Sequence, residues 1–238
     1  MKLDILAIAA HPDDVELSCS GTLASHVEKG YKVGILDLTQ GEMGTRGTPA
    51  LRLEEAEQAA KIMGLSAREN LGFKDVFFED DQAHQVAIAR IIRKYRPEMV
   101  LANAVSDRHP DHGKGGSMAS HACFISGLRK VETEMDGKLQ EAWRPKAIYH
   151  YIQNNYIEPD LVVDISSHWE TKINSILAFQ SQFYNPESKE PESFISRPDF
   201  LDFIEARSRE MGHKINVKYG EGFTVERVAG VKNLFDLL

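Results

Sequence analysis

Residues 3–16, LDILAIAAHPDDVE, place a cluster of polar side chains directly after an apolar run. The apolar run Ile5–Ala10 is short and continuous, which is typical of a strand buried on both faces of a parallel sheet, and we expect this strand over Leu3–Ala10. Proline fixes its own φ and restricts the residue before it to extended geometry, so His11 leaves the strand in a defined direction. The stretch therefore predicts a buried strand whose carboxyl end carries His11, Asp13 and Asp14.

A second cluster of the same kind lies about a hundred residues further on. The apolar run Met99–Asn103 predicts another buried strand, and the sequence HPDH at 109–112 follows it shortly. One His-Pro-Asp sequence alone usually forms a polar turn. Two such clusters, each after a buried strand, indicate a shared site.

Apolar runs and amphipathic segments alternate through the first half of the chain. Strands are expected at Leu3–Ala10, Lys32–Leu38, Glu69–Phe73 and Met99–Asn103, and helices at 22–29, from Thr48-Pro49 to Met63, and at 82–95. The second half predicts helices at 113–129, 168–180 and 198–213, strands at 146–151, 160–165 and near 222–228, and a loop at 184–198. This alternation favours an α/β fold, a Rossmann-like, doubly wound and mostly parallel sheet with helices on both faces. We expect a single domain over residues 1–238.

The strand order brings the two clusters together. In a doubly wound sheet of order 3-2-1-4, strands one and four are neighbours, and ligands bind at their carboxyl ends. Two imidazoles and one carboxylate make a catalytic zinc site with a position open for water. We therefore expect His11, Asp14 and His112 to be the metal ligands, although the same set accepts iron, manganese or cobalt.

The remaining polar residues of the clusters suit the hydrolysis of an amide. A bound metal makes water a nucleophile at neutral pH, and a carboxylate such as Asp13 can take its proton. His109 can stabilise the oxyanion or protonate the leaving group, and Asp111 is expected to orient His109 and favour its charged form. A metal-stabilised binding module without turnover is the alternative.

A shaped loop, TQGEMGTRG at 39–47, follows the second strand at the same edge of the sheet. Arg46 and Arg52 are candidates for contact with substrate, because a guanidinium grips a carboxylate through two parallel hydrogen bonds. The alternative is a surface arginine paired with Glu54 or Glu55. The three glycines of the loop have the spacing G-x-x-G-x-x-G, which does not match a dinucleotide-binding fingerprint.

The composition excludes several classes of partner. The 238 residues include 28 Lys plus Arg and 36 Asp plus Glu, a net charge of −8, which argues against binding to nucleic acid or to anionic membranes. Cys19 and Cys123 are too far apart in sequence for a disulfide framework or a cysteine-based zinc site. The first residues resemble neither a signal peptide nor a membrane span, so a cytoplasmic protein is expected.

The segments AHPDDVE at 10–16 and HPDH at 109–112 resemble the two signatures of the LmbE-like, or PIG-L, family of zinc-dependent N-acetylglucosamine deacetylases. The stretches 41–48, 141–147, 181–186 and 221–227 are similar to one branch, the bacillithiol biosynthesis deacetylases. The resemblance implies an LmbE-like fold and one Zn²⁺ per chain.

The family resemblance also implies roles for the residues of the two clusters. His11, Asp14 and His112 would hold the zinc and Asp13 would be the general base. His109 would stabilise the oxyanion and protonate the amine, with Asp111 behind it. Arg52 matches a position expected near the sugar or the metal-bound intermediate.

The branch resemblance implies a substrate and an assembly. The substrate would be N-acetylglucosaminyl-malate, hydrolysed to glucosaminyl-malate and acetate, and the chain would form a homo-oligomer such as a hexamer. A mycothiol precursor, a chitooligosaccharide or an antibiotic intermediate stays open as the substrate. Malate would need a local cationic patch, for which Arg46, Arg52, Arg108 and Lys114 are the candidates. His121 is a spare candidate for the site.

Overall fold

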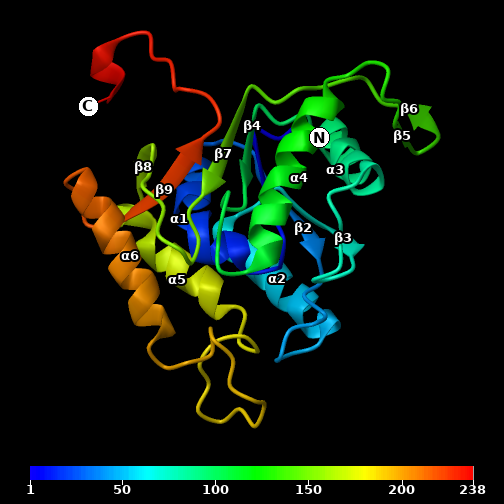
Figure 1. Ribbon diagram of the computed structural model, residues 1–238. Coiled ribbons are helices and arrows are strands. Elements are labelled where there is room, and N and C mark those ends of the chain that lie inside the picture. The colour runs from blue at the N-terminus through cyan, green and yellow to red at the C-terminus, as the bar shows by residue number, and fades with distance from the viewer. Residues whose placement is uncertain (238) are drawn as a thin grey trace.

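The computed structural model describes residues 1–237, and seven strands of that part of the chain form one sheet in the order β3-β2-β1-β4-β7-β9-β8 (Figure 1). Its strands are β1 (Ile5–Ala9), β2 (Val33–Thr39), β3 (Ala67–Phe73), β4 (Met99–Ala102), β7 (Ala147–Tyr151), β8 (Leu161–Asp164) and β9 (Gly220–Val225). The first five pair in parallel, and β9 is antiparallel to both β7 and β8. The expected mostly parallel sheet and its order 3-2-1-4 are thereby confirmed. The antiparallel edge was not predicted, nor was a separate hairpin of β5 (Glu134–Met135) and β6 (Lys138–Leu139).

The helices fall close to the segments that the periodicity predicts. They are α1 (Asp14–Glu28), α2 (Pro49–Met63), α3 (Gln82–Tyr95), α4 (Pro110–Ser126), α5 (Trp169–Leu177) and α6 (Phe200–Lys214), with 3₁₀ turns η1 (Ser166–His168) and η2 (Leu234–Leu237). Thr48 begins α2 as expected, because its side chain accepts a hydrogen bond from the Leu51 N–H at 3.2 Å.

The prediction for the first helix was wrong about its start. We expected a helix from residue 22, whereas α1 begins at Asp14, immediately after the first polar cluster. Cys19 interrupts it with φ −143° and ψ 16°. The apolar spacing detected only the second segment, since the first segment carries the polar residues of the site. Among the described residues, no helix is both long and apolar enough to cross a membrane.

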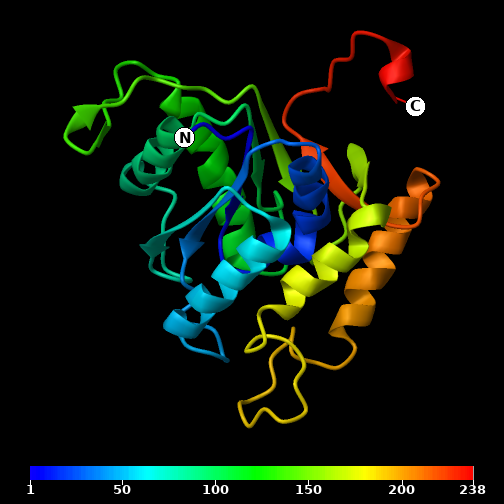
Figure 2. The same cartoon turned by 180° about the vertical axis from the view of Figure 1, so that it is seen from behind.

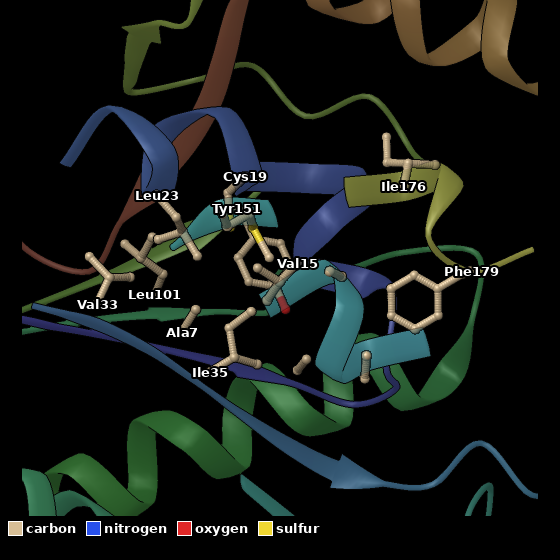
Figure 3. Packing of buried hydrophobic residues seen from close by; sticks show 14 of the residues in the cluster. Ala7, Val15, Cys19, Leu23, Val33, Ile35, Leu101, Tyr151, Ile176 and Phe179 are labelled. Atoms are coloured by element: carbon tan, nitrogen blue, oxygen red, sulfur yellow. The ribbon is translucent and has the colours of Figure 1, made fainter. Parts of the chain in front are cut away.

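The strands are buried because helices cover both faces of the sheet. In β1, Ile5, Ala7 and Ala9 pack with residues of α1, α2 and α5, the helices nearest the viewer in Figure 2. The alternate residues Leu6 and Ile8 pack with α3 and α4, in front of the sheet in Figure 1. Figure 3 shows the first cluster, where side chains of the sheet meet those of α1 and α5. This alternation explains the continuous apolar run of the sequence.

The carboxyl ends of β1, β2, β3, β4 and β7 lie at one edge of the sheet. The long connection between α5 and α6 reaches the same side, next to the loop after β2 (Figures 1 and 2). Two hydrogen bonds join these loops, from Gln182 Nε2 to the Arg46 carbonyl at 2.7 Å and from the Gly47 N–H to Glu190 Oε1 at 2.9 Å. The stretch 184–198 contains no helix or strand, as expected.

Candidate metal centre

The two histidine clusters meet around the carboxylate of Asp14. Asp14 Oδ2 lies 3.6 Å from His11 Nδ1, and its Oδ1 lies 3.0 Å from His112 Nε2. The His11 and His112 rings are 5.6 Å apart between centroids, and His109 is 4.8 Å from His11. Residues almost a hundred positions apart are thus brought together, as the strand order predicts.

The other ring nitrogen of each imidazole contacts a second carboxylate. His11 Nε2 lies 3.0 Å from Asp75 Oδ1, and His112 Nδ1 lies 2.5 Å from Asp107 Oδ2. Histidines that bind metals usually donate their outer N–H to a carboxylate in this way, which leaves the inner nitrogen for the ion. Here the inner nitrogens are those that face Asp14.

The donor set fits a zinc ion. Zinc takes nitrogen and oxygen ligands at about 2.0–2.2 Å, so neighbouring ligand atoms in a tetrahedral site are roughly 3.4 Å apart. Each imidazole lies at about that separation from one of the two Asp14 oxygens, His11 Nδ1 at 3.6 Å from Oδ2 and His112 Nε2 at 3.0 Å from Oδ1. Among the described residues, ligand atoms that all lie within 4.8 Å of one another occur in two overlapping sets, one of His11, His109 and His112 and one of His11, Asp75 and Asp111, and Asp14 belongs to neither. The site can therefore hold a cation between its imidazoles and carboxylates.

Hydrogen bonds fix the orientation of Asp14. Its carboxylate accepts from the His11 N–H at 2.9 Å, from Asn103 Nδ2 at 2.9 Å and from Gln153 Nε2 at 3.2 Å. Asn103 also accepts from the Ala10 N–H at 2.8 Å, which ties the end of β4 to the end of β1. Asp14 is 3% exposed, so its position depends on these partners.

Sequence reasoning missed four residues that support the site, namely Asp75, Asn103, Asp107 and Gln153. Asn103 and Asp107 lie between strand β4 and the second cluster, where polar side chains at a strand end are a usable signal. Asp75 and Gln153 follow β3 and β7, so the rule that ligands bind at carboxyl ends could have found them.

The charges of the site suit a divalent cation. Burial lowers the pKa of His11, but hydrogen bonds with three carboxylates, led by Asp111, outweigh it and raise that pKa well above its usual value. Burial likewise lowers the pKa of His112, and Asp14 and Asp107 raise it to about 9. Burial raises the pKa of the Asp14 carboxyl, but the two imidazoles hold it well below its usual range. A bound cation would supply the positive charge that protons supply here.

Asp13 lies beside the metal ligands in a strained backbone conformation. Its φ is +114°, a left-handed value that asparagine and aspartate adopt more readily than most residues. Arg52 donates from Nη2 to Asp13 Oδ2 at 3.0 Å and to the Pro12 carbonyl at 2.5 Å. Burial raises the pKa of Asp13 to about 7, against the opposing effect of Arg52. The carboxyl is thus poised to exchange a proton near neutral pH.

The expected pairing of Asp111 with His109 is not present. Asp111 Oδ2 accepts from the Val76 N–H at 2.9 Å and lies 3.4 Å from His11 Nε2. His109 Nδ1 accepts from the backbone N–H of Asp111 at 3.3 Å. Burial and the neighbouring imidazoles lower the pKa of His109, so a charged form is not favoured. With Nδ1 as acceptor, the neutral ring carries its proton on Nε2.

Only one of the two candidate arginines lines the cleft of the site. Arg52 lines the cleft of the site, with its guanidinium held by Asp13, the Pro12 carbonyl and the Gly41 carbonyl. Arg46 does not line it. The Arg46 guanidinium is buried and donates from Nη1 to the Phe183 carbonyl at 3.3 Å, so the expected contact with substrate is replaced by attachment of the long α5–α6 connection.

Two hollows meet at Asp14 and His112. The wider one, of about 190 Å³, is the open cleft and contains His11, Asp13 and His109. The narrower one, of about 70 Å³, runs between α1 and α6. Its apolar wall consists of Leu17, Ile152, Phe194, Ile195, Phe200, Phe203, Ile204 and Met211. Arg108 borders both hollows, with its guanidinium 4.1 Å from the Phe194 ring centre.

Comparisons with known proteins agree with this site. A family model described as PIG-L, GlcNAc-PI de-N-acetylase, matches residues 6–123, which include both histidine clusters. The diacetylchitobiose deacetylase of Thermococcus kodakarensis is 29% identical over 191 residues, 75% of this chain and 70% of that protein. A probable N-acetyl-alpha-D-glucosaminyl L-malate deacetylase 2 of Bacillus cereus is 27% identical over 195 residues, 76% of this chain and 84% of that protein. The crystal structure of the conserved protein TT1542 from Thermus thermophilus is 36% identical, covers 97% of this chain and 98% of its own, and has a TM-score of 0.86.

Fold, site and relatives together define a metal-dependent amidohydrolase. The chain belongs to the PIG-L family of N-deacetylases. The predicted family and class of enzyme are thereby confirmed, and the relatives named above differ in the substrate that their names give.

Proposed function

We propose that the chain is a zinc-dependent deacetylase that hydrolyses the acetamide of N-acetylglucosaminyl-malate to glucosaminyl-malate and acetate, the reaction of bacillithiol biosynthesis. The observation that carries amide hydrolysis is the convergence of Asp14 with two imidazoles, each anchored by an outer carboxylate, beside the base candidate Asp13. The malate assignment rests on the sequence stretches shared with the bacillithiol branch and on the basic side chain at the cleft.

We assign His11, Asp14 and His112 as the zinc ligands. When bound, zinc lowers the pKa of a water molecule to about 7 and so supplies a nucleophile at neutral pH. Asp75 and Asp107 orient the two imidazoles, and Asn103 with Gln153 orients the carboxylate. These contacts hold the donor atoms in place before the ion arrives, which lowers the cost of ordering them.

Asp13 is the general base in this proposal. Arg52 occupies Oδ2, which leaves Oδ1 to accept the proton of the attacking water. Its pKa of about 7 lies near the pH at which a general base is most effective. Arg52 therefore acts on the substrate indirectly, through the position of the base.

His109 is the donor on the opposite side of the scissile bond. Its Nδ1 accepts from the Asp111 backbone, so the Nε2–H of the neutral ring is available as a hydrogen-bond donor to the developing oxyanion. The proton that the leaving amine needs is the one that Asp13 has taken from the attacking water. Asp111 supports this step only through its backbone, while its carboxylate contacts His11.

In this proposal the two hollows hold the two parts of the substrate that lie on either side of its amide bond. The leaving amino sugar must meet the proton that Asp13 carries, and Asp13 lines the wider cleft and not the narrower pocket. The methyl group of the acetyl then points toward the narrower, apolar pocket. Three of the four basic residues expected around malate are engaged by protein groups, whereas Arg108 forms no ion pair among the described residues and borders the cleft. We therefore assign the malate carboxylates to Arg108.

The decisive test is incubation of the zinc-loaded enzyme with N-acetylglucosaminyl-malate and detection of free amine and acetate. A panel that includes N-acetylglucosaminyl-inositol and diacetylchitobiose measures selectivity. The Arg108→Ala variant should raise KM for the malate conjugate alone, and Arg129→Ala, at an exposed site, is the matched control. Equal rates across the panel would refute the malate assignment and leave a general N-acetylglucosamine deacetylase. No acetate release from any member would refute the function itself.

A further inference from the structure

Helix α1, whose N-terminus carries the acidic pair of the site, is built from two segments. Cys19 breaks it with φ −143° and ψ 16°, so the turn after Asp14 and the segment toward Glu28 follow separate paths. A break inside a helix leaves backbone groups without helical partners, carbonyls before the break and N–H groups after it. Burial makes such groups costly unless other side chains satisfy them.

Lys172 of α5 satisfies the carbonyls before the break. Its side chain is 1% exposed, and Nζ donates to the Glu16 carbonyl at 3.1 Å and to the Leu17 carbonyl at 2.8 Å. The third partner of the ammonium is Glu221 Oε1 at 2.8 Å. Two of the three donors of the ammonium are thus engaged on the carboxyl end of the first segment, so Lys172 caps this segment from a position 155 residues after Leu17.

Glu221 of β9 satisfies the N–H groups after the break. Its side chain is 2% exposed, Oε1 accepts from the Gly21 N–H at 3.1 Å, and Oε2 accepts from the Thr22 N–H at 2.6 Å. The signs of the two charges match the ends that they cap. A cation lies at the carboxyl end of the first segment and an anion at the amino end of the second, as the helix dipole favours.

The first segment connects this pair to the catalytic residues. The Leu17 N–H donates to the Asp13 carbonyl at 2.9 Å, and the Leu17 carbonyl is the one that Lys172 holds at 2.8 Å. Asp14 is the first residue of the same segment. A shift of this short turn would therefore move Asp13 and Asp14 together relative to His112, which belongs to α4.

We propose that the Lys172–Glu221 pair is a positioning device, which locks the break in α1 and thereby sets the place of Asp14 for zinc and of Asp13 for proton transfer. The proposal rests on the function assigned above for these two aspartates. Stability alone is a weak reason for such a pair, because a buried ion pair is often replaceable by apolar residues at no net cost. What an apolar pair lacks here is the set of four backbone hydrogen bonds at the break.

The test compares two variants. Glu221→Gln keeps an acceptor for the N–H groups, and Lys172→Met/Glu221→Gln removes in addition the cap on the carbonyls. Zinc affinity is measured by competition with a chelator, and kcat and KM are measured well below the melting temperature. We expect the double variant to lose roughly 10–100-fold in zinc affinity, the range for groups that orient metal ligands, and Glu221→Gln to lose much less. We expect kcat to fall as well, and because Lys172 and Glu221 also line the narrower pocket, zinc affinity and not KM is the deciding readout.

The matched control removes a surface pair, Lys214→Met/Glu158→Gln, whose ion pair of 2.8 Å is exposed. A folded Lys172→Met/Glu221→Gln protein with the zinc affinity and kcat of the control would overturn the proposal and leave a purely structural pair. If the double variant does not fold, Lys172→Gln, whose amide replaces the three donors with two, decides the same question by the same readouts. Zinc affinity is independent of the substrate, so it tests the proposal even where no deacetylation is found.

Discussion

Replacement of Asp13 by asparagine separates proton transfer from metal binding more cleanly than any other change at the site. The amide oxygen can accept the hydrogen bond that Arg52 donates to Oδ2 at 3.0 Å, so the guanidinium keeps its partner. Asparagine also adopts the left-handed backbone of this position, where φ is +114°. Fold and metal site should therefore persist in Asp13→Asn, while the group that accepts the proton is lost.

The expected loss in turnover follows from the role of a general base. Such a group contributes 10²–10⁴-fold to the rate, which corresponds to about 2.7–5.4 kcal/mol at 1.36 kcal/mol for each factor of ten. We expect kcat of Asp13→Asn to fall by roughly this factor and zinc content to stay at one per chain. The assay combines acetate release under saturating substrate with metal analysis of the purified variant.

The variant Asp13→Ala distinguishes loss of the base from loss of the partner of Arg52. Alanine leaves the buried guanidinium of Arg52 without its carboxylate, and breaking a buried ion pair costs about 3–5 kcal/mol. Asp13→Ala should therefore lower the melting temperature as well as kcat, whereas Asp13→Asn lowers mainly kcat. If Asp13→Asn turned over at more than a tenth of the wild-type rate, Asp13 would not be the base. If the folded variant lost its zinc, Asp13 would be a ligand.

Three further outcomes test the site and its support. His112→Ala should purify without zinc, and a variant with full zinc content would show that His112 is no ligand. In the wild type, removal of zinc by a chelator should lower the melting temperature reversibly, since an ion at 1,000 times its Kd stabilises a fold by about 4 kcal/mol. Asn103→Ala removes three buried hydrogen bonds, one of 2.8 Å and two of 2.9 Å, and should reduce zinc affinity roughly 10–100-fold in chelator competition. An unchanged affinity would contradict its role. Gly41→Ala places a methyl group 1.8 Å from Arg52 Nη1 and should lower both kcat and thermal stability. The control Gly30→Ala, at a glycine with the same sign of φ and nothing within 4 Å, should lower stability less and leave kcat unchanged. Equal effects of the two variants on kcat would show that the position of Arg52 does not matter for turnover.

The convergence of the two clusters could be derived from sequence for a simple reason. Parallel strands joined by right-handed crossovers place all their carboxyl ends at one edge of the sheet. Once the runs before His11 and His109 are recognised as strands, only the strand order is needed to place them side by side. The same rule predicted neither the role of Asp111 nor that of Arg46, because it locates a residue at an edge without stating where its side chain points.

Which groups the side chains of Asp111 and Arg46 contact could be seen only in the tertiary structure. Asp111 was expected to hold His109, but the α4 N-terminus directs its carboxylate toward His11 and the Val76 N–H. Arg46 was expected at the substrate, but the chain between α5 and α6 passes over it and takes its hydrogen bonds. Both outcomes depend on segments far away in sequence, whose approach leaves no periodic pattern in the local residues.

The sequence by itself determined the layered fold and the site's main residues, because apolar periodicity and the two His-Pro-Asp clusters are local signals that burial and backbone geometry impose directly. Only the tertiary structure decided what holds those residues in place. Asp75, Asp107 and the Lys172–Glu221 pair act through hydrogen bonds between elements brought together by packing. A polar side chain that satisfies a distant backbone group looks like any other polar residue until the chain is folded around it.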